Sequence, residues 1–210
     1  MTTKASLLII DVQNDFCPGG ALPVPAGDRV VAPLNRAAEL FAAAGLPVVA
    51  SRDWHPPVTS HFNAYGGIWP SHCVQGSRGA EFHPQLRLPP GYFLLSKGFE
   101  SDTDSYSAFD GRLADGSSLQ LLLATLGVAR LFVGGLATDY CVKESVLAAL
   151  RTGLQVVVLE DAVAGVDVTA GDSLRAMKEM KTAGASFSSV TALTQGTYFH
   201  SCHSHRFSTC

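Results

Sequence analysis

Charged residues are scarce in this sequence, and the positive ones form no run. Asp, Glu, Lys and Arg make up 16% of the 210 residues, against roughly 25% in an average soluble protein. The net charge is −3, and the 15 Lys and Arg residues are scattered along the chain. A surface for nucleic acid or an anionic membrane needs clustered positive charge. We therefore expect neither nucleic acid nor a membrane as a partner.

Long apolar runs are missing as well. The N-terminal stretch MTTKASLLIIDVQ has an apolar run too short for a signal peptide, and the run ends in an acid. No stretch approaches the roughly 20 apolar residues that a membrane span needs. We therefore expect a cytoplasmic protein. The five cysteines are an odd number without regular spacing, and a reducing compartment would keep them as thiols.

The chain does contain enough hydrophobic residues for one large core. Hydrophobic residues make up 47% of the sequence, and a chain of this length buries most of its apolar surface in a single domain. We predict one domain over residues 1–193 and a flexible, polar tail over residues 194–210. The apolar content is also compatible with a homo-oligomer. Several metal-binding residue types lie in the tail at a spacing that matches no site: His200, Cys202, His203, His205 and Cys210.

Short apolar runs alternate with stretches of helical periodicity. The runs predict strands at 6–12, 46–51, 91–97, 129–135, 154–161 and, weakly, 185–190. The periodic stretches predict helices at 28–44, 116–126, 139–152 and 170–183. Strands separated by helices indicate βαβ units, whose right-handed crossovers build parallel sheets. The predicted fold is a doubly wound α/β sandwich of three layers, with a mainly parallel sheet and helices on both faces.

Residues 54–90 interrupt this alternation. They form a connection of nearly forty residues without a convincing helix, whereas such loops usually have about two to six residues. Long loops in compact domains are usually functional. We therefore expect this loop to carry part of a site.

Reactive side chains follow the predicted strands where each strand ends. Asp11 ends the first strand, and Asp53 and His55 follow the second. Lys97 ends the third, and Cys141 lies in the first helical turn after the fourth. Because parallel α/β sheets carry their sites at the carboxyl ends of the strands, we expect these side chains to meet.

Cys141 lies in the stretch GGLATDYCV, where Thr138 or Asp139 can cap the following helix. The helix dipole and Lys97 would favour the thiolate, and the free N–H groups of the first turn could hold an oxyanion. Asp11 could take the thiol proton and pass it to a leaving amine. The alternative is that Cys141 is a small buried hydrophobe.

The loop adds metal-ligand chemistry to this edge. Asp53 and His55 are two residues apart in an extended segment, so both point to the same side, and His61 and His72 follow in the loop. A carboxylate with two or three imidazoles suits zinc, iron or manganese with open positions for water or substrate. The alternative is a solvated loop histidine, which applies most to His61.

Five motifs together resemble one known family. In order they are LLIIDVQNDFCPGGALPV, SRDWHPPVTSHF, WPSHCVQG, SKGFESDTDSYSAFDG and GGLATDYCV. The chain resembles the nicotinamidases of the isochorismatase-like cysteine hydrolases from about Leu7 to Leu193. The resemblance implies hydrolysis of nicotinamide to nicotinate and ammonia in NAD salvage, with pyrazinamide as a second candidate substrate. It also implies a cysteine thioester intermediate and one divalent metal ion, zinc first, with iron or manganese as alternatives.

The resemblance further implies roles for single residues. Cys141 matches the family's nucleophile, Asp11 its proton shuttle and Lys97 its electrostatic support. The backbone N–H groups of Ala137 and Cys141 match an oxyanion hole, next to a cis peptide bond between Leu136 and Ala137.

The metal and substrate positions are implied in the same way. Asp53, His55 and His72 match metal ligands, and His61 matches a position that coordinates in some members, directly or through water. The aromatic residues that sandwich the pyridine ring match Phe16 and Trp69. Tyr140 departs from many relatives at the position before the nucleophile.

Two other functions stay open on the sequence alone. One is a related amidohydrolase acting on another carboxamide, an N-carbamoyl compound or isochorismate, although such relatives generally lack the histidines of the loop. The other is a metal- or redox-sensing binding protein in which Cys141 is oxidised. No resolving cysteine lies near Cys141 in the sequence, and Asp11 and Lys97 would then have no role.

Overall fold

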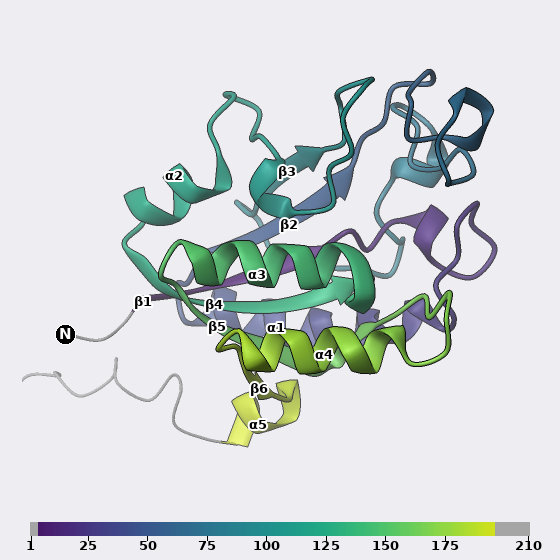
Figure 1. The fold of residues 1–210 in the computed structure, drawn as a ribbon. Coiled ribbons are helices and arrows are strands. Elements are labelled where there is room, and N and C mark those ends of the chain that lie inside the picture. The colour runs from purple at the N-terminus through teal and green to yellow at the C-terminus, as the bar shows by residue number, and fades with distance from the viewer. Residues whose placement is uncertain (1–3, 196–210) are drawn as a thin grey trace, which may run out of the picture.

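Six parallel strands form a single sheet at the centre of the molecule (Figure 1). The computed structural model describes residues 4–195. The strand order is β3-β2-β1-β4-β5-β6. The strands are β1 Lys4–Ile10, β2 Val48–Asp53, β3 Phe93–Lys97, β4 Val128–Leu136, β5 Gln155–Ala164 and β6 Ser186–Ser188. The helices are α1 Val31–Ala43, α2 Leu119–Thr125, α3 Lys143–Arg151, α4 Asp172–Thr182 and α5 Val190–Gln195.

The central position of β1 explains why its residues 7–10 are all apolar. Successive side chains of a strand point to opposite faces of the sheet, and both faces here are covered. Leu7 and Ile9 pack with α1 and α5, whereas Leu8 and Ile10 pack with α2, α3 and α4. Figure 1 shows α3 and α4 on one side of the sheet and α1 on the other. The predicted parallel sheet with helices on both faces is confirmed.

Two helix starts differ from the prediction for local reasons. The helix predicted from residue 116 begins at Leu119, because the Ser118 hydroxyl accepts a hydrogen bond from the N–H of Leu121 and caps the helix there. The helix predicted from residue 139 begins instead as a π-helical turn over Thr138–Val142 and becomes α-helical at Lys143.

The C-terminal part of the prediction needs a larger correction. The weak strand predicted at 185–190 is only three residues long, and α5 begins at Val190. The Asp161 carboxylate accepts a hydrogen bond from the N–H of Val190, and Val190 and Leu193 pack with α1. Thr194 and Gln195, the first residues of the predicted flexible tail, therefore belong to a helix. The remainder of the predicted tail lies outside the described residues.

The carboxyl ends of β1, β2, β3 and β4 are brought level by the register of the sheet. Asp53 of β2 is the direct partner of Lys97 of β3, and Ile10 of β1 is the partner of Gly135 of β4. Gly135 has φ +127°, and a Cβ atom there would lie 2.0 Å from the backbone oxygen of Ile10. Only glycine permits this close approach. The strand order reverses between β1 and β4, where ligands of open α/β sheets usually bind.

The long connection between β2 and β3 is ordered by polar residues of the N-terminal motif. Its only helical turns among residues 54–92, all of which are described, are 3-10 turns at Asn63–Tyr65 and Arg78–Ala80. The buried Gln13 amide donates to the backbone oxygens of Asp53 and Ala80, at 2.8 and 2.9 Å. The Asp15 carboxylate accepts from the N–H of Cys73 at 2.7 Å. These bonds fix the loop over the carboxyl edge of the sheet.

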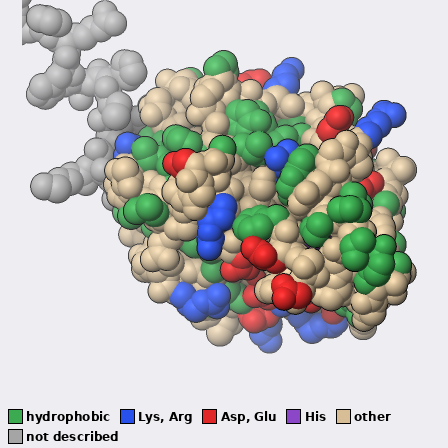
Figure 2. All heavy atoms as spheres, turned by 90° about the horizontal axis from the view of Figure 1, so that it is seen from above, with side chains coloured by type: hydrophobic (Ala, Val, Ile, Leu, Met, Phe, Trp, Pro, Cys, Tyr) green, Lys and Arg blue, Asp and Glu red, His purple; other side chains and the backbone are tan. Residues whose placement is uncertain are grey.

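The surface agrees with the mixed charge of the sequence. Figure 2 shows Lys and Arg side chains dispersed among Asp, Glu and apolar side chains on the face seen from above. Among residues 4–195, no helix combines the length and apolar character needed to cross a lipid bilayer.

Candidate active site

Lys97 is the centre of a buried group of charged and reactive side chains, called here the lysine cluster: Asp11, Asp53, Lys97 and Cys141. The Lys97 ammonium donates a short hydrogen bond to Asp53 and lies 3.0 Å from an Asp11 carboxylate oxygen. It also donates to the Cys141 Sγ at 3.5 Å and to the backbone oxygen of Ser105 at 3.2 Å. The three residues that end strands, and the cysteine after β4, are thus brought together as the topology predicts.

The two carboxylates of the lysine cluster have different electrostatic environments. Burial raises the pKa of Asp11, and the Lys97 ammonium offsets this only in part. Burial also acts to raise the pKa of Asp53, but Lys97 and His55 lower it below its usual value. Lys97 itself loses solvation, yet the two acids raise its pKa well above the usual value. Asp53 and Lys97 therefore form a lasting ion pair, whereas Asp11 is suited to exchange a proton.

The Cys141 thiol behaves differently from the sequence prediction. Burial raises the pKa of Cys141 well above its usual value, and the lowering by Lys97 is opposed by Asp11 and Asp53. A thiol, rather than a free thiolate, is therefore the resting form of Cys141. The predicted capping by Thr138 or Asp139 is also wrong, because no side chain caps this turn. The cis bond between Leu136 and Ala137 is present.

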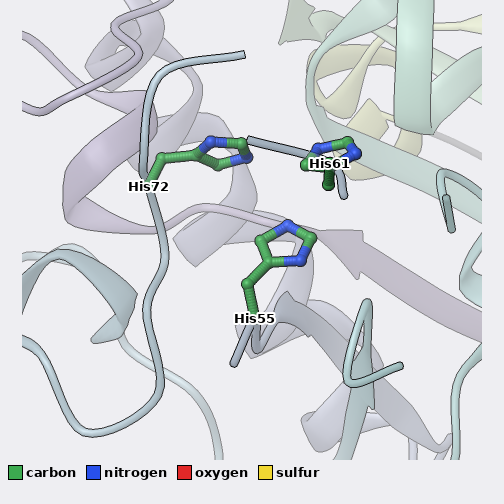
Figure 3. A group of neighbouring side chains, drawn as sticks. All are labelled: His55, His61 and His72. Carbon is green, nitrogen blue, oxygen red and sulfur yellow. The ribbon is translucent and has the colours of Figure 1, made fainter. Parts of the chain in front are cut away.

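Three histidines form a second buried group beside the first, called here the histidine cluster: His55, His61 and His72. One ligand atom from each lies within 4.8 Å of the others. His55 follows β2 directly, whereas His61 and His72 come from the long loop. Figure 3 shows the three rings arranged around a common space. All three are buried, so the solvated alternative for His61 is wrong.

Each ring of the histidine cluster is oriented through its Nδ1 atom. His55 Nδ1 lies 2.9 Å from the Gly98 carbonyl, and His72 Nδ1 lies 2.7 Å from the Pro70 carbonyl. His61 Nδ1 lies 2.6 Å from the Asp104 carboxylate. Carbonyl and carboxylate oxygens only accept, so each Nδ1 carries the proton. The three Nε2 lone pairs are left for another partner.

The histidine cluster fits a metal ion. The Nε2 atom of His55 is buried and has no hydrogen-bond partner among the described residues. Such an orphaned acceptor is costly unless something binds it. Burial lowers the pKa of His61, and it lowers the pKa of His72 to about 4, so these imidazoles stay neutral, as metal ligands must. Oriented histidines of this kind are typical of metal sites.

Asp53 joins the two clusters. One of its oxygens accepts from Lys97, and the other lies 3.8 Å from Nε2 of His55. The group of possible ligands that includes Asp53 also contains Asp11 and Cys141 rather than the histidines. Asp53 is thus placed at the border of the histidine cluster, where its free oxygen could join a metal ion held by the three rings.

A pocket opens over both clusters. Its lining includes Cys141, His61 and His72, and its apolar wall is formed by six residues: Phe16, Leu22, Val24, Trp69, Ala137 and Val166. The rings of Phe16 and His72 are 5.4 Å apart. The pocket is thus lined mostly by apolar side chains, with the reactive thiol and two of the histidines at its edge.

Several residues around the pocket are not indicated by the sequence patterns. Tyr106 accepts a hydrogen bond from the Trp69 indole at 2.9 Å, and Tyr140 lies 5.1 Å from the Trp69 ring. The Ser51 hydroxyl donates to the Asp11 carboxylate at 2.7 Å. Asp104 and Tyr106 do lie in the motif SKGFESDTDSYSAFDG, but nothing in that motif indicates which polar residue faces the site.

Comparison with known proteins agrees with this geometry. A family model described as the isochorismatase domain matches residues 5–192. The chain belongs to the isochorismatase family. Among family members, the nicotinamidase of Escherichia coli (strain K12) is 42% identical over 196 residues, covering 86% of this chain and 92% of the relative.

Solved structures of family members have the same fold. The pyrazinamidase of Pyrococcus horikoshii in complex with zinc has a TM-score of 0.82 and 41% identity, covering 89% of this chain and 99% of that one. PnC1 of L. infantum in complex with nicotinate has a TM-score of 0.77 and 36% identity, covering 91% and 96%. The isochorismatase-like fold expected from the sequence is confirmed.

Proposed function

We propose that this chain is a nicotinamidase, which hydrolyses nicotinamide to nicotinate and ammonia and so serves NAD salvage. The observation that carries the proposal is the lysine cluster. Its buried ammonium lies 3.5 Å from the thiol and 3.0 Å from the proton-exchanging acid, and the thiol lines a pocket whose wall is mostly apolar. The E. coli relative is named a nicotinamidase, and the L. infantum relative binds nicotinate.

In the first half of the proposed cycle, Cys141 attacks the carboxamide carbon while Asp11 takes the thiol proton. The raised pKa of Asp11 suits it to hold that proton. A carbon–sulfur bond forms and the carbonyl oxygen becomes an oxyanion, which the backbone N–H groups of Ala137 and Cys141 are proposed to stabilise. Asp11 then gives its proton to the departing nitrogen, so the carbon–nitrogen bond breaks and ammonia leaves a thioester.

In the second half, a water molecule attacks the thioester while Asp11 takes one of its protons. The carbon–sulfur bond breaks, the acid is released, and the proton returns from Asp11 to the Cys141 sulfur. Lys97 keeps its charge throughout, because two acids hold its pKa well above the usual value. Its role is to balance the negative charge that moves between Asp11 and Cys141.

The proposed metal ligands are His55, His61, His72 and Asp53. A divalent ion held there would act as a Lewis acid that binds the pyridine nitrogen or a water molecule. We propose zinc, because the P. horikoshii relative binds zinc and zinc accepts nitrogen and oxygen ligands. Iron and manganese suit the same ligands.

Phe16 and Trp69 are the proposed ring-binding residues. Phe16 is held by the short turn Asn14–Phe16, and the Trp69 indole is anchored by the Tyr106 hydroxyl. Their rings would bind the two faces of the pyridine, as aromatic pairs favour. The pyrazine ring of pyrazinamide has the same flat shape and is a second expected substrate.

The first test is ammonia release from nicotinamide by purified protein. We expect activity as isolated, loss after chelation, and recovery after adding back Zn²⁺, Fe²⁺ or Mn²⁺ alone. Removing a catalytic nucleophile typically costs on the order of 10⁶-fold in rate, with residual catalysis from binding, so we expect Cys141→Ala to lose at least ~10⁴-fold. Its circular dichroism and metal content should match the wild type. Ammonia release by Cys141→Ala at the wild-type rate would refute the nucleophile.

A further inference from the structure

Asp139 is a buried acid two residues before Cys141. Its carboxylate accepts hydrogen bonds from backbone groups outside its own helix. It is only 7% exposed. One carboxylate oxygen accepts from the N–H of Val166 at 3.0 Å, and the other accepts from the N–H of Asp167 at 2.8 Å. A carboxylate that binds two successive backbone N–H groups holds that backbone firmly, because charge-assisted hydrogen bonds are the strong ones.

The segment that Asp139 holds is the turn from β5 into α4. Gly165 begins the turn, and a Cβ atom there would lie 1.8 Å from the Ser173 hydroxyl and 3.0 Å from an Asp139 oxygen. Asp167 has φ +52°, and its carboxylate accepts from the N–H and the hydroxyl of Ser173, both at 2.8 Å. Two side chains therefore hold the turn in place. Asp139, near the nucleophile, binds its backbone, and Ser173 of α4 binds the Asp167 side chain.

Val166, the second residue of this turn, is part of the pocket wall. It lines the pocket together with Cys141, and it packs against the apolar cluster that contains Phe16. The position of one pocket wall is therefore set by a carboxylate on the turn that carries the sulfur.

We propose that Asp139 is a positioning residue for substrate specificity, which fixes Val166 and so limits the size of the ring that can be placed over Cys141. The inference rests on the proposed function and adds to it the residue that sets ring size. Asp139→Asn would keep the side-chain shape, but an amide offers one acceptor oxygen and a donor NH₂. One of the two N–H groups would then face a donor, and the turn would be released.

The test compares nicotinamide with nicotinamides methylated at ring carbon 4, 5 or 6. One extra methylene typically changes discrimination by ~10- to 200-fold. We expect Asp139→Asn to lower the wild-type discrimination against at least one methylated substrate by about tenfold, with KM for nicotinamide raised and kcat within about threefold. Asp161→Asn is the matched control, because Asp161 also accepts a backbone N–H, at the start of α5. It should leave the discrimination unchanged.

A double-mutant cycle with Val166→Ala tests whether Asp139 acts on specificity through Val166. If Asp139 acts through Val166, the two substitutions together should relax discrimination no more than Val166→Ala alone. Additive effects would overturn the inference. A lower melting temperature for Asp139→Asn with unchanged discrimination would overturn it as well, because that is the result of a purely structural role.

The inference and the proposed function can fail separately. If the wild type releases no ammonia from nicotinamide, the proposed function fails. Specificity is then measured as the calorimetric affinity ratio between nicotinate and its methylated forms, for the wild type, Asp139→Asn and Asp161→Asn. A ratio that Asp139→Asn reduces while Asp161→Asn does not would support the inference, and an unchanged ratio would overturn it.

Discussion

The lysine cluster and the histidine cluster touch at Asp53 but are built on different principles. In the first, three members end the neighbouring strands β1, β2 and β3, so the register of the sheet sets their spacing. In the second, two of the three rings come from a loop, and each ring is oriented by a single acceptor. The sheet supplies fixed positions, whereas the loop supplies ligands.

The two clusters also differ in what completes them. The charges of the lysine cluster compensate one another within the chain, since Lys97 contacts both acids. The histidine cluster directs lone pairs to a common space, and His55 Nε2 finds no partner among residues 4–195. The members of one cluster therefore find their partners within the folded chain itself, whereas the other cluster has ligand atoms left for an added ion.

The largest expected difference is in how much the free energy of unfolding falls when one member of each cluster is replaced. Lys97→Met leaves two buried carboxylates without their cation, which typically costs about 3–5 kcal/mol of stability. His61→Gln in metal-free protein should cost much less, because it leaves no buried charge. Urea unfolding of both variants at pH 7 measures the difference. Adding Asp53→Asn to Lys97→Met should restore part of the loss, and equal losses for the two single variants would contradict the comparison.

A second difference is the response of metal-free protein to acid. Burial lowers the pKa of His72 to about 4, against about 6.5 when unfolded. Between these values the unfolded chain binds more protons, so stability is full above pH 6.5 and falls as the pH drops towards 4, by about 3 kcal/mol. Asp53 has a lowered pKa and loses its contribution only at lower pH. Urea unfolding between pH 7 and 4.5 should show this slope, and His72→Gln should reduce it, leaving the smaller slope of the same sign that the lowered pKa of His61 contributes.

The smallest expected effect concerns the acceptor behind one ring. Asp104 holds Nδ1 of His61 at 2.6 Å while its own side chain is 58% exposed. Loss of such a partner typically weakens metal binding by about 10- to 100-fold, and we expect the lower end of this range for Asp104→Asn, whose neutral amide oxygen is a weaker acceptor than the carboxylate, without a change in metal-free stability. Competition with a chromogenic chelator measures the affinity. Asp102→Asn, an exposed neighbour on the same loop, is the control, and equal affinities for the two variants would exclude the role of Asp104.

The sequence is informative where the sheet alone decides position. The proximity of Asp11, Asp53 and Lys97 follows from the order of strands and helices along the chain, because a parallel sheet aligns the carboxyl ends of its strands. Asp53 and the histidines that follow it in the sequence indicate a metal site, because carboxylate and imidazole groups are common ligands of divalent metal ions.

The remaining features depend on contacts between distant segments. The sequence pattern favours Asp139 as a cap for its own helix, but its partners lie 27 and 28 residues further along. A helix start and a lysine predict a lowered pKa for Cys141, yet burial raises it. Local patterns do not reveal which distant backbone group competes for a carboxylate, or how deeply a side chain is buried.

The central position of β1 has a consequence for synthesis on the ribosome. β1 is the first strand to be translated, but one of its two neighbours, β4, spans residues 128–136. Until that segment emerges, the nascent chain holds Asp11 on a strand with an open edge, and unpaired edges invite association with other chains. The strand that closes this edge leads directly into the turn with Cys141. Pairing of β4 with β1 therefore covers the exposed strand edge and at the same time brings Cys141 next to Asp11.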